Sequence, residues 1–180
     1  MSHPFRNISP KRTCTKKRSK YNAYKPFLAE DFNHKCGYTD CSDYWFGGQR
    51  CFQIDHFKPK EKYPLLVNEY SNLVYCCSYV NRAKWDDDNA NYLDPCSVDY
   101  NKHFERDNRG FITAISTQAQ YMVDHLQLNL FRYAICWNLD RLREKINILK
   151  KVATTSEEKD LLLSLYAEYD KYEDYLKDSQ

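Results

Sequence analysis

Apolar and polar residues alternate along the stretch "RCFQIDHF", from Arg50 to Phe57. Phe52 and Ile54 occupy the apolar positions of this alternation, and polar residues lie between them. A period of two is typical of a β-strand that buries one face. The pattern therefore predicts a strand whose end carries an adjacent Asp–His pair.

A loop broken by Pro59 and Pro64 separates this strand from a second apolar run, "NLVYCC" at 72–77. A short apolar run between polar segments predicts a second strand. The next segment, "SYVNRAKWDD" at 78–87, suits a single helix. The middle of the chain is therefore expected to run strand, long loop, strand, helix.

Two further short elements are expected on either side of this unit. A helix is predicted from Pro26 to Asn33, because proline suits the first position of a helix. A β-hairpin is predicted in "HFERDNRGFITA" at 103–114, with its turn at Asp107–Gly110. Together with the central unit, these elements indicate an α+β fold.

The last third of the chain carries two apolar stripes at helical spacing. The first stripe belongs to one long helix and consists of Leu128, Phe131, Ile135, Leu139, Leu142, Ile146 and Leu149. The second follows a capping box, "TSEE" at 155–158, and consists of Leu161, Leu165, Tyr169, Tyr172 and Leu176. Two striped helices joined by a short link predict an antiparallel helical hairpin.

Length and composition favour one ordinary domain, or one domain with an appendage. The chain has 180 residues, of which 42% are hydrophobic, enough for a core. No apolar run approaches the roughly 20 residues of a membrane span, and the N-terminus lacks the apolar region of a secretory signal. We therefore expect a cytoplasmic protein with no membrane contact. Its eight cysteines are then expected to be thiols or metal ligands.

Charge is divided unevenly along the chain. Residues 1–84 carry 15 Lys and Arg against 7 Asp and Glu, a net +8, whereas residues 85–180 carry 12 against 18, a net −6. A basic half favours a polyanionic partner, although a basic segment can also serve only solubility. We expect three parts: a mobile basic arm at 1–25, a central domain at 26–112 and a helical region at 113–180.

Asp55 and His56 are followed by Asn72 in "SNLVYCC" and by Asn81 in "VNRAK". This ordered set resembles the HNH endonuclease family, whose signature is an Asp–His pair at a strand end, an Asn in the connecting segment and a His or Asn on the next helix. The resemblance covers residues 33–97 and implies a ββα-metal core. The longer string "IDHFKPK…YSNLVYCC…NRAK…YLDPC" is also similar to HNH proteins of bacterial anti-phage defence systems.

The resemblance implies metal-assisted hydrolysis of phosphodiester bonds. Asp55 and Asn81 would supply oxygen ligands to Mg²⁺ or Mn²⁺, which prefer oxygen and keep several waters. His56 would be the general base that deprotonates the attacking water. Asn72 would brace the loop and orient the histidine, and Lys84 would steady the phosphate.

Many members of this family also hold a structural zinc with two Cys-x-x-Cys pairs, in a tetrahedral thiolate site. In this chain the second pair is incomplete, because Val80 occupies the position of its last ligand. The expected ligands are Cys36, Cys41, Cys77 and Cys96, with Cys76 as the second choice for the fourth position. The alternative is that these cysteines are reduced core residues. The remaining cysteines are expected to be incidental: Cys14, Cys51 and Cys136.

Basic residues flank the expected site and are candidates for binding DNA phosphates: Arg50, Lys58, Lys60, Lys62 and Arg82. Phosphate contacts provide affinity without sequence information, and no base-reading motif is visible. The nuclease is therefore expected to be nonspecific or directed by a partner. By default, the amphipathic C-terminal helices are expected only to support the nuclease core. The defence-system resemblance favours instead a protein partner docked on them, such as an ATPase that restrains the nuclease. RNA is not excluded as the substrate, because a metal-activated water does not need the 2′-hydroxyl.

A function of a different class stays open. The same cysteines and basic residues suit a zinc-stabilised nucleic-acid-binding or adaptor module whose Asp–His–Asn set is inactive. An adaptor needs the cysteines but not His56, whereas a nuclease needs His56. Loss of this one side chain therefore distinguishes the two.

Overall fold

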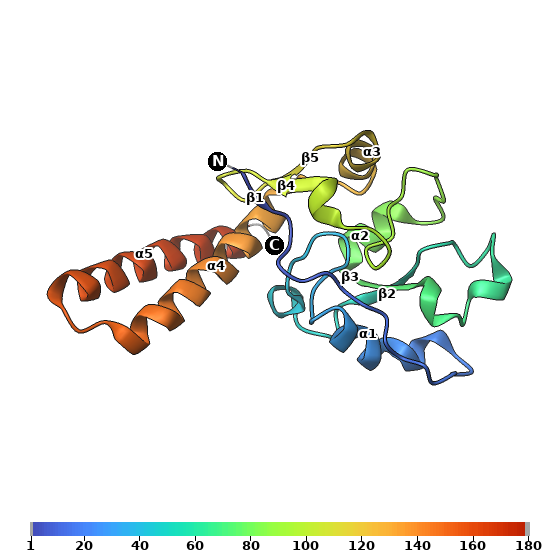
Figure 1. The fold of residues 1–180 in the computed structure, drawn as a ribbon, viewed down its shortest axis with the longest axis horizontal. Helices are drawn as coiled ribbons and strands as arrows, with labels where there is room; N and C mark the ends of the chain where they lie inside the picture. The colour runs from blue at the N-terminus through green and yellow to red at the C-terminus, as the bar shows by residue number, and fades with distance from the viewer. Residues whose placement is uncertain (1, 179–180) are drawn as a thin grey trace.

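The computed structural model describes residues 2–178, and its α and β elements are mixed along the chain, as expected for an α+β protein (Figure 1). The strands are β1 (His3–Pro4), β2 (Gln53–His56), β3 (Leu73–Cys76), β4 (Phe104–Arg106) and β5 (Ile112–Ala114). The α-helices are α1 (Lys25–Asp31), α2 (Ser78–Lys84), α3 (Thr117–His125), α4 (Phe131–Val152) and α5 (Ser156–Asp178). Short 3-10 helices lie at Tyr21–Tyr24, Asp43–Phe46, Pro64–Leu66, Tyr70–Asn72 and Tyr100–Lys102.

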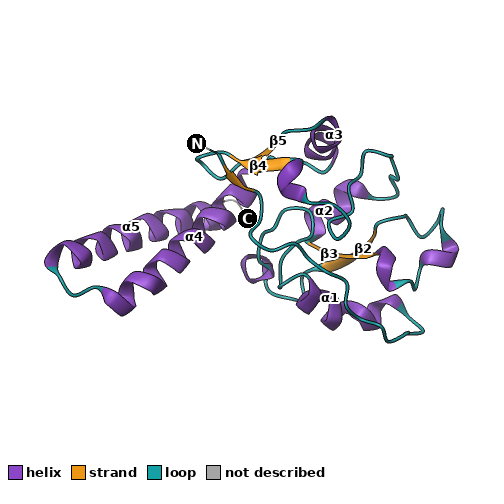
Figure 2. Cartoon of the chain, in the orientation of Figure 1, coloured by secondary structure: helices purple, strands orange, loops and turns teal. Residues whose placement is uncertain are grey.

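The central unit consists of β2, β3 and α2, in the predicted order. β2 and β3 pair antiparallel, with Asp55 opposite Val74 and His56 opposite Leu73. β3 is buried along its whole length, and α2 begins directly after it. Figure 2 shows this strand pair between α1 and α2. The two strands therefore hold the Asp–His pair at a fixed place beside α2.

The N-terminal segment differs from the expected mobile arm, at least at its beginning. β1 pairs with β4 in a three-stranded sheet of order β1-β4-β5. Phe5 is fully buried and its ring contacts those of Tyr100 and Phe104. Further on, Arg12 forms an ion pair with Asp94 at 2.8 Å. Phe5 and the ion-paired Arg12 hold this segment in place. The basic composition of the segment gives no sign of these two contacts.

The β4–β5 hairpin has the predicted turn, in which the Gly110 N–H donates to the Asp107 carbonyl at 3.0 Å. Gly110 has a φ of +92°, a conformation that side chains disfavour. A Cβ here would also lie 2.7 Å from the Trp137 ring of α4. The Arg106 side chain is buried beneath the turn and donates to the Gly110 carbonyl at 2.8 Å. The hairpin is thus packed closely against α4.

Helix α3 was not among the predicted elements. Ser116 caps it by accepting the Ala119 N–H at 3.2 Å, and Met122 lies in the core. The chain then passes through Gln127, with a φ of +53°, before α4 begins at Phe131. Leu128, which the pattern placed in the long helix, is buried in this connection instead. The nine residues of α3 are too few for a clear apolar stripe.

The last two helices form the predicted hairpin, which projects from the body of the molecule (Figure 1). The capping box is present, since the Thr155 N–H donates to Glu158 at 3.0 Å and the Glu158 N–H donates to the Thr155 hydroxyl at 3.2 Å. Along α4 the apolar stripe is buried at Ile135, Leu139, Leu142 and Ile146, whereas Phe131 at the start of the helix is 48% exposed. The distal end leaves apolar side chains more than half exposed: Ile148, Val152, Leu161 and Leu163. The expectation that Leu161 would be covered is therefore wrong.

The two hairpin helices have 22 and 23 residues, but charged side chains recur along both. Within residues 2–178, none of the helices combines the length and the apolar character that a membrane crossing requires.

Candidate active site

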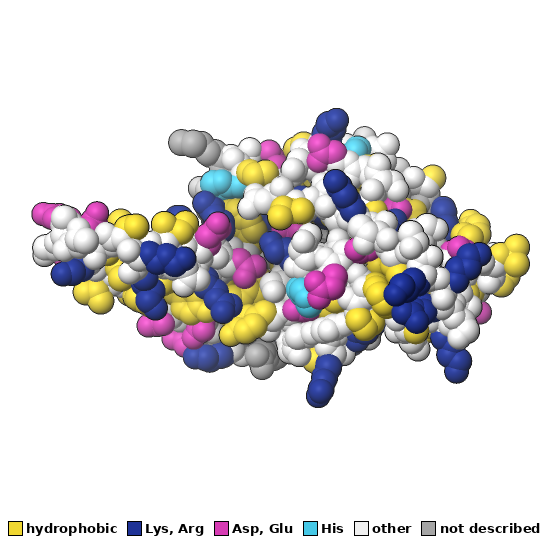
Figure 3. Space-filling view, turned by 60° about the horizontal axis from the view of Figure 1, so that its bottom comes forward, with side chains coloured by type: hydrophobic (Ala, Val, Ile, Leu, Met, Phe, Trp, Pro, Cys, Tyr) yellow, Lys and Arg dark blue, Asp and Glu magenta, His cyan; other side chains and the backbone are white. Residues whose placement is uncertain are grey.

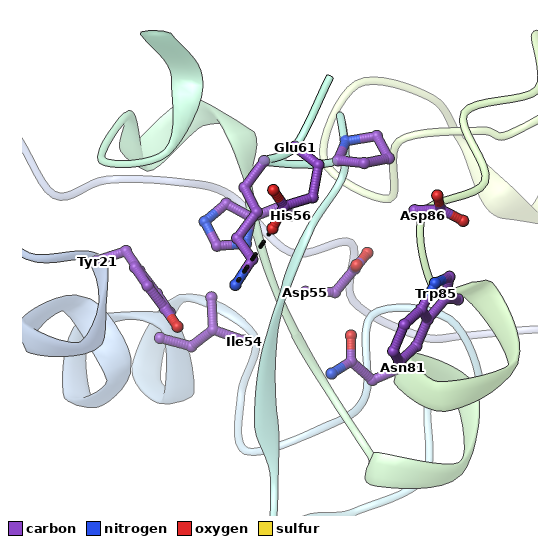
Figure 4. A pocket seen from close by; sticks show the side chains of 10 residues that line it. Tyr21, Ile54, Asp55, His56, Glu61, Asn81, Trp85 and Asp86 are labelled. Atoms are coloured by element: carbon purple, nitrogen blue, oxygen red, sulfur yellow. Dashed lines mark ion pairs between the residues drawn. The ribbon is translucent and has the colours of Figure 1, made fainter. Parts of the chain in front are cut away.

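A cleft of about 370 Å³ opens beside the end of β2. Asp55 and His56 from β2 and Asn81 from α2 all line it (Figure 4). The other two expected catalytic residues, Asn72 and Lys84, lie behind this surface and are buried. The strand pair and the helix that follows it therefore bring three of the five residues to one solvent-accessible place.

Asp55 is held firmly at the base of the cleft, with 3% of its surface exposed. Its Oδ2 accepts the Tyr38 hydroxyl at 2.6 Å, and its Oδ1 accepts Lys84 Nζ at 3.1 Å. Burial, together with the Asp55 charge, raises the pKa of Tyr38 far above its ordinary value, so the phenol stays protonated and donates. Because each carboxylate oxygen has two lone pairs, both oxygens retain capacity for one more ligand.

Lys84 does not have the expected position for a phosphate contact. Its side chain is wholly buried, and its Nζ donates to Asp55 Oδ1 and to the His56 carbonyl at 2.9 Å. The ammonium group therefore lies behind β2 rather than in the cleft. A buried cation needs a paired anion, and Asp55 supplies it. The structure thus corrects the expected role of Lys84 from phosphate binding to fixing the end of β2.

His56 is 8% exposed, and its Nε2 lies 3.0 Å from the Val67 carbonyl oxygen. A carbonyl only accepts, so Nε2 carries the proton and Nδ1 keeps its lone pair. The ring edge packs against Tyr21, with the centroids 4.7 Å apart. Burial lowers the pKa of His56 below its ordinary value of 6.5. The imidazole is therefore neutral at pH 7, the form that accepts a proton.

Asn72 ties together the loop that follows β2. Its Oδ1 accepts the Lys58 N–H at 2.8 Å, and its Nδ2 donates to the carbonyls of Lys58 at 3.0 Å and Leu66 at 3.3 Å. Leu66 precedes Val67, whose carbonyl holds the His56 ring. Asn72 therefore supports the histidine through the backbone rather than by direct contact.

Asn81 is the second oxygen donor of the cleft. Its Nδ2 donates to Gln53 Oε1 at 2.6 Å, which fixes the orientation of the amide. Figure 4 shows the amide oxygen on the side that faces Asp55. Asp86 also lines the cleft, next to Trp85 at the end of α2. A carboxylate and an amide oxygen side by side are ligands of the kind that Mg²⁺ and Mn²⁺ prefer.

Within residues 2–178, Lys60 is the only one of the five expected phosphate-binding residues that lines the cleft. Lys62 is paired with Asp88 at 3.0 Å, and Arg82 lies over the Tyr79 ring beside a separate hollow. Lys58 lies near the Phe57 and Tyr63 rings, and Arg50 is exposed. On the face that Figure 3 shows, basic side chains are interspersed with acidic ones.

Four of the eight cysteines neighbour one another in two pairs. The sulfurs of Cys36 and Cys77 are 4.0 Å apart, and Cys41, whose thiol donates to the Tyr133 carbonyl at 3.7 Å, is a neighbour of Cys136 of α4. Cys96, the expected fourth zinc ligand, lies beside Arg12 and Asp94 instead. As packed in the described part of the chain, no three His, Cys, Asp or Glu side chains form a group that could hold a metal ion.

Several residues in or beneath the cleft carry no signal in the sequence. The cleft residues Tyr21, Trp85 and Asp86, and the buried Tyr38 beneath Asp55, have neither a motif nor a spacing that distinguishes them, and tyrosine alone occurs 16 times. Cys136 is 95 residues from its neighbour Cys41, so spacing does not reveal this pair. Only the folded arrangement identifies these residues.

Comparison of the chain with protein-family models, with curated proteins and with solved structures finds no match. The function is therefore inferred from the chemistry of the cleft itself.

Proposed function

We propose that the protein is a metal-dependent HNH-type endonuclease that hydrolyses phosphodiester bonds, with DNA as its substrate and RNA as the second candidate. The single observation that carries this proposal is the cleft in which Asp55, His56 and Asn81 meet. Metal-assisted hydrolysis requires a general base and oxygen ligands for the metal ion. The neutral imidazole and the two side-chain oxygens beside it can supply these groups. The order β2, β3, α2 supports the ββα-metal resemblance.

The oxygen donors fit a hard divalent cation. Asp55 and Asn81 would hold Mg²⁺ or Mn²⁺, leaving coordination positions for waters and for the phosphate. When bound, such an ion neutralises charge on the phosphoryl oxygens and on the leaving 3′ oxygen. Lys84 already compensates part of the Asp55 charge, so the site is suited to a weakly held ion rather than to a permanent one.

His56 performs the proton transfer. Its Nδ1 accepts a proton from a water as the water oxygen forms a bond to phosphorus, and the bond from phosphorus to the 3′ oxygen breaks. The Val67 carbonyl keeps the ring in the required tautomer throughout. Asn72 maintains the loop that supplies this carbonyl. General-base catalysis of this kind contributes about 10²- to 10⁴-fold in rate.

Partner binding is a further part of the proposal. The distal hairpin exposes Ile148, Val152, Leu161 and Leu163, which supports a protein partner there. The defence-system resemblance favours a partner such as an ATPase that restrains the nuclease, because an unrestrained nonspecific nuclease would harm its own cell. Elution of the protein as a monomer from cells that contain its genomic neighbours would contradict this part.

A structural zinc is proposed on the paired thiols. Ligand sulfurs in a tetrahedral zinc site lie about 3.8 Å apart, as follows from Zn–S bonds of about 2.3 Å. The 4.0 Å between Cys36 and Cys77 is close to this separation. Cys41 and its neighbour Cys136 are proposed as the other two ligands, in place of Cys96. The two pairs would have to converge when the ion binds.

The test of the nuclease proposal is cleavage of labelled DNA and RNA by the purified protein with Mg²⁺ or Mn²⁺ and with EDTA. Cleavage that requires the metal and stops with EDTA is the expected result. Metal-independent cleavage would contradict the mechanism. Nucleic-acid binding without cleavage, with the genomic neighbours present, would favour the inactive adaptor.

A further inference from the structure

Trp85 has an unusual combination of backbone conformation and exposure. It follows the last residue of α2 with φ +49° and ψ −120°. The Lys84 carbonyl accepts the Asp87 N–H at 3.0 Å, which closes a tight turn with Trp85 at its first central position. These angles belong to a type II′ turn, in which this position is normally glycine. A bulky side chain is therefore held in a strained conformation.

The strain has no compensation in packing. The Trp85 side chain is 77% exposed, so it contributes little to the core. The turn itself is needed, because the Trp85 N–H donates to the Asn81 carbonyl at 3.1 Å and ends the helix that carries Asn81. Glycine would form the same turn without strain. Strained residues that persist without a folding benefit are concentrated at functional sites.

The position of Trp85 indicates what the indole contacts. It lines the cleft, and Figure 4 shows it beside Asn81 and across the cleft from Tyr21. Tyr21 is half-buried and packs its ring against His56. The cleft thus has an aromatic side chain on each side of the Asp–His pair. A flat, apolar group adjacent to the scissile phosphate would meet one of these rings.

The charge beside Trp85 favours a neutral contact. Asp86 follows Trp85 and lines the cleft next to it, whereas Glu61 lines the cleft on the side of His56 (Figure 4). Lys60 is near Glu61, with 3.9 Å between the charged atoms. Carboxylates repel phosphates, so ion pairing does not account for binding on the Trp85 side. Stacking of a base on an indole does not depend on this charge, and every nucleobase has a face that can stack.

We propose that Trp85 is the stacking platform for an unpaired nucleobase next to the scissile phosphate. Bases inside a duplex already stack on their neighbours, so the substrate class is single-stranded or looped nucleic acid. This inference rests on the proposed nuclease function and names its substrate. DNA and RNA share the stacking chemistry, and the experiment distinguishes them.

The experiment measures binding in the His56→Ala background, so that no probe is cleaved. Fluorescently labelled oligonucleotides of one sequence are titrated as single-stranded DNA, single-stranded RNA and duplex DNA with Mg²⁺. The variants are Trp85→Gly, Trp85→Phe and the control Tyr44→Ala, which removes a 60% exposed aromatic that does not line the cleft. Trp85→Gly relieves the turn strain, so thermal unfolding should show a stability no lower than that of the parent.

Trp85→Gly is expected to weaken single-strand binding roughly 5- to 150-fold, the range for loss of one base–aromatic stack. Trp85→Phe retains most of the affinity, Tyr44→Ala retains all of it, and duplex binding does not change. Quenching of tryptophan fluorescence by the bound strand disappears in Trp85→Gly. The inference is supported whether the DNA strand or the RNA strand binds more tightly. The tighter of the two identifies the kind of nucleic acid that is the substrate.

Single-strand binding that is equally tight with and without Trp85 would overturn this inference alone. Equal weakening of single-strand and duplex binding in Trp85→Gly would overturn it as well. Failure of every form to bind any of the three probes, together with no metal-dependent cleavage by the parent protein, would overturn the proposed function too.

Discussion

At the scale of single residues, the chemistry of the cleft depends on His56. This histidine stays neutral at a pH at which an exposed histidine would begin to take up a proton. Burial lowers the pKa of His56 below 6.5, and the Val67 carbonyl fixes the proton on Nε2. The lone pair on Nδ1 is therefore available over a wider pH range than in a solvated histidine. The same burial makes protonation unfavourable for the folded state.

The pH dependence of cleavage follows from this. Protonated His56 accepts no proton, so the cleavage rate should fall toward acid with a midpoint below 6.5. The folded state binds this proton less readily than the unfolded state, so stability from this group is complete above about pH 6.5 and decreases as the pH falls. Initial rates measured from about pH 5 to pH 8 check the midpoint. A rate that increases toward acid would contradict the role of a neutral base.

The Lys84–Asp55 pair gives a prediction about stability. Lys84→Met leaves the Asp55 carboxylate buried without its cation, which should lower the free energy of unfolding by about 3–5 kcal/mol. Urea unfolding measures this change. The double variant with Asp55→Asn should recover part of the loss, because no charge is then left unpaired. Lys60→Met is the exposed control and should stay within about 0.5 kcal/mol of wild type. Equal stability of Lys84→Met and Lys60→Met would show that the buried pair is unimportant.

The sequence predicts some of these residues but not their contacts. Asp55, His56 and Asn81 follow from an ordered motif, and the structure brings them to one cleft. The direction of Lys84 does not follow from its spacing to Asn81, because it depends on how α2 packs on β2. Trp85 likewise cannot be singled out from the sequence, because its strained backbone angles are seen only in the structure.

At the scale of elements, the β4–β5 turn is the place where the hairpin touches α4. Gly110→Ala should destabilise the protein by about 1–3 kcal/mol, because the φ of +92° disfavours a side chain and its Cβ would clash with Trp137 and Asn138. Gly48→Ala is the matched control, since Gly48 has a φ of +79° but open space around it. Denaturant unfolding should therefore show a larger loss for Gly110→Ala. The opposite order would contradict the close packing of the turn.

The zinc proposal joins the central unit to α4 and can be tested by elemental analysis. The purified protein should contain about one zinc per chain, with the metal lost in Cys77→Ser and in Cys136→Ser. Cys96→Ser should keep the metal, because Cys96 lies beside Arg12 and Asp94. Zinc retained by Cys136→Ser but lost by Cys96→Ser would restore the ligand set expected from the sequence. A folded, metal-free wild type would reject the site altogether.

Periodicity predicted the elements that have a regular apolar pattern. β2 and the two C-terminal helices follow from it, whereas β3 was predicted from a short apolar run and the β4–β5 hairpin from its turn residues. β1 has two residues and α3 has nine, too few to establish a period. The N-terminal segment was expected to be mobile because most of its signal is basic. One apolar residue, Phe5, is buried in the core and anchors the beginning of the segment. Short segments that are fixed by tertiary contacts are invisible to a local pattern.

At the scale of the whole molecule, the cleft and the distal hairpin lie on different sides. Figure 1 shows α4 and α5 projecting away from β2 and the loop that follows it. A partner on the exposed distal residues would leave the cleft open to nucleic acid. Most of the residues that line the cleft belong to the basic half of the sequence, except Trp85 and Asp86, and the hairpin belongs to the acidic half.

The central claim is that this cleft hydrolyses phosphodiester bonds with His56 as the base. The most direct measurement is nicking of supercoiled plasmid with Mg²⁺ or Mn²⁺, with any protein partner copurified, by wild type, His56→Ala and His125→Ala. His125 is an exposed histidine on α3 that stacks on Tyr121, so its loss controls for general effects of substitution. We predict metal-dependent nicking that His56→Ala reduces about 10²- to 10⁴-fold and His125→Ala preserves. Equal nicking by His56→Ala and wild type, with both proteins folded, would contradict the account.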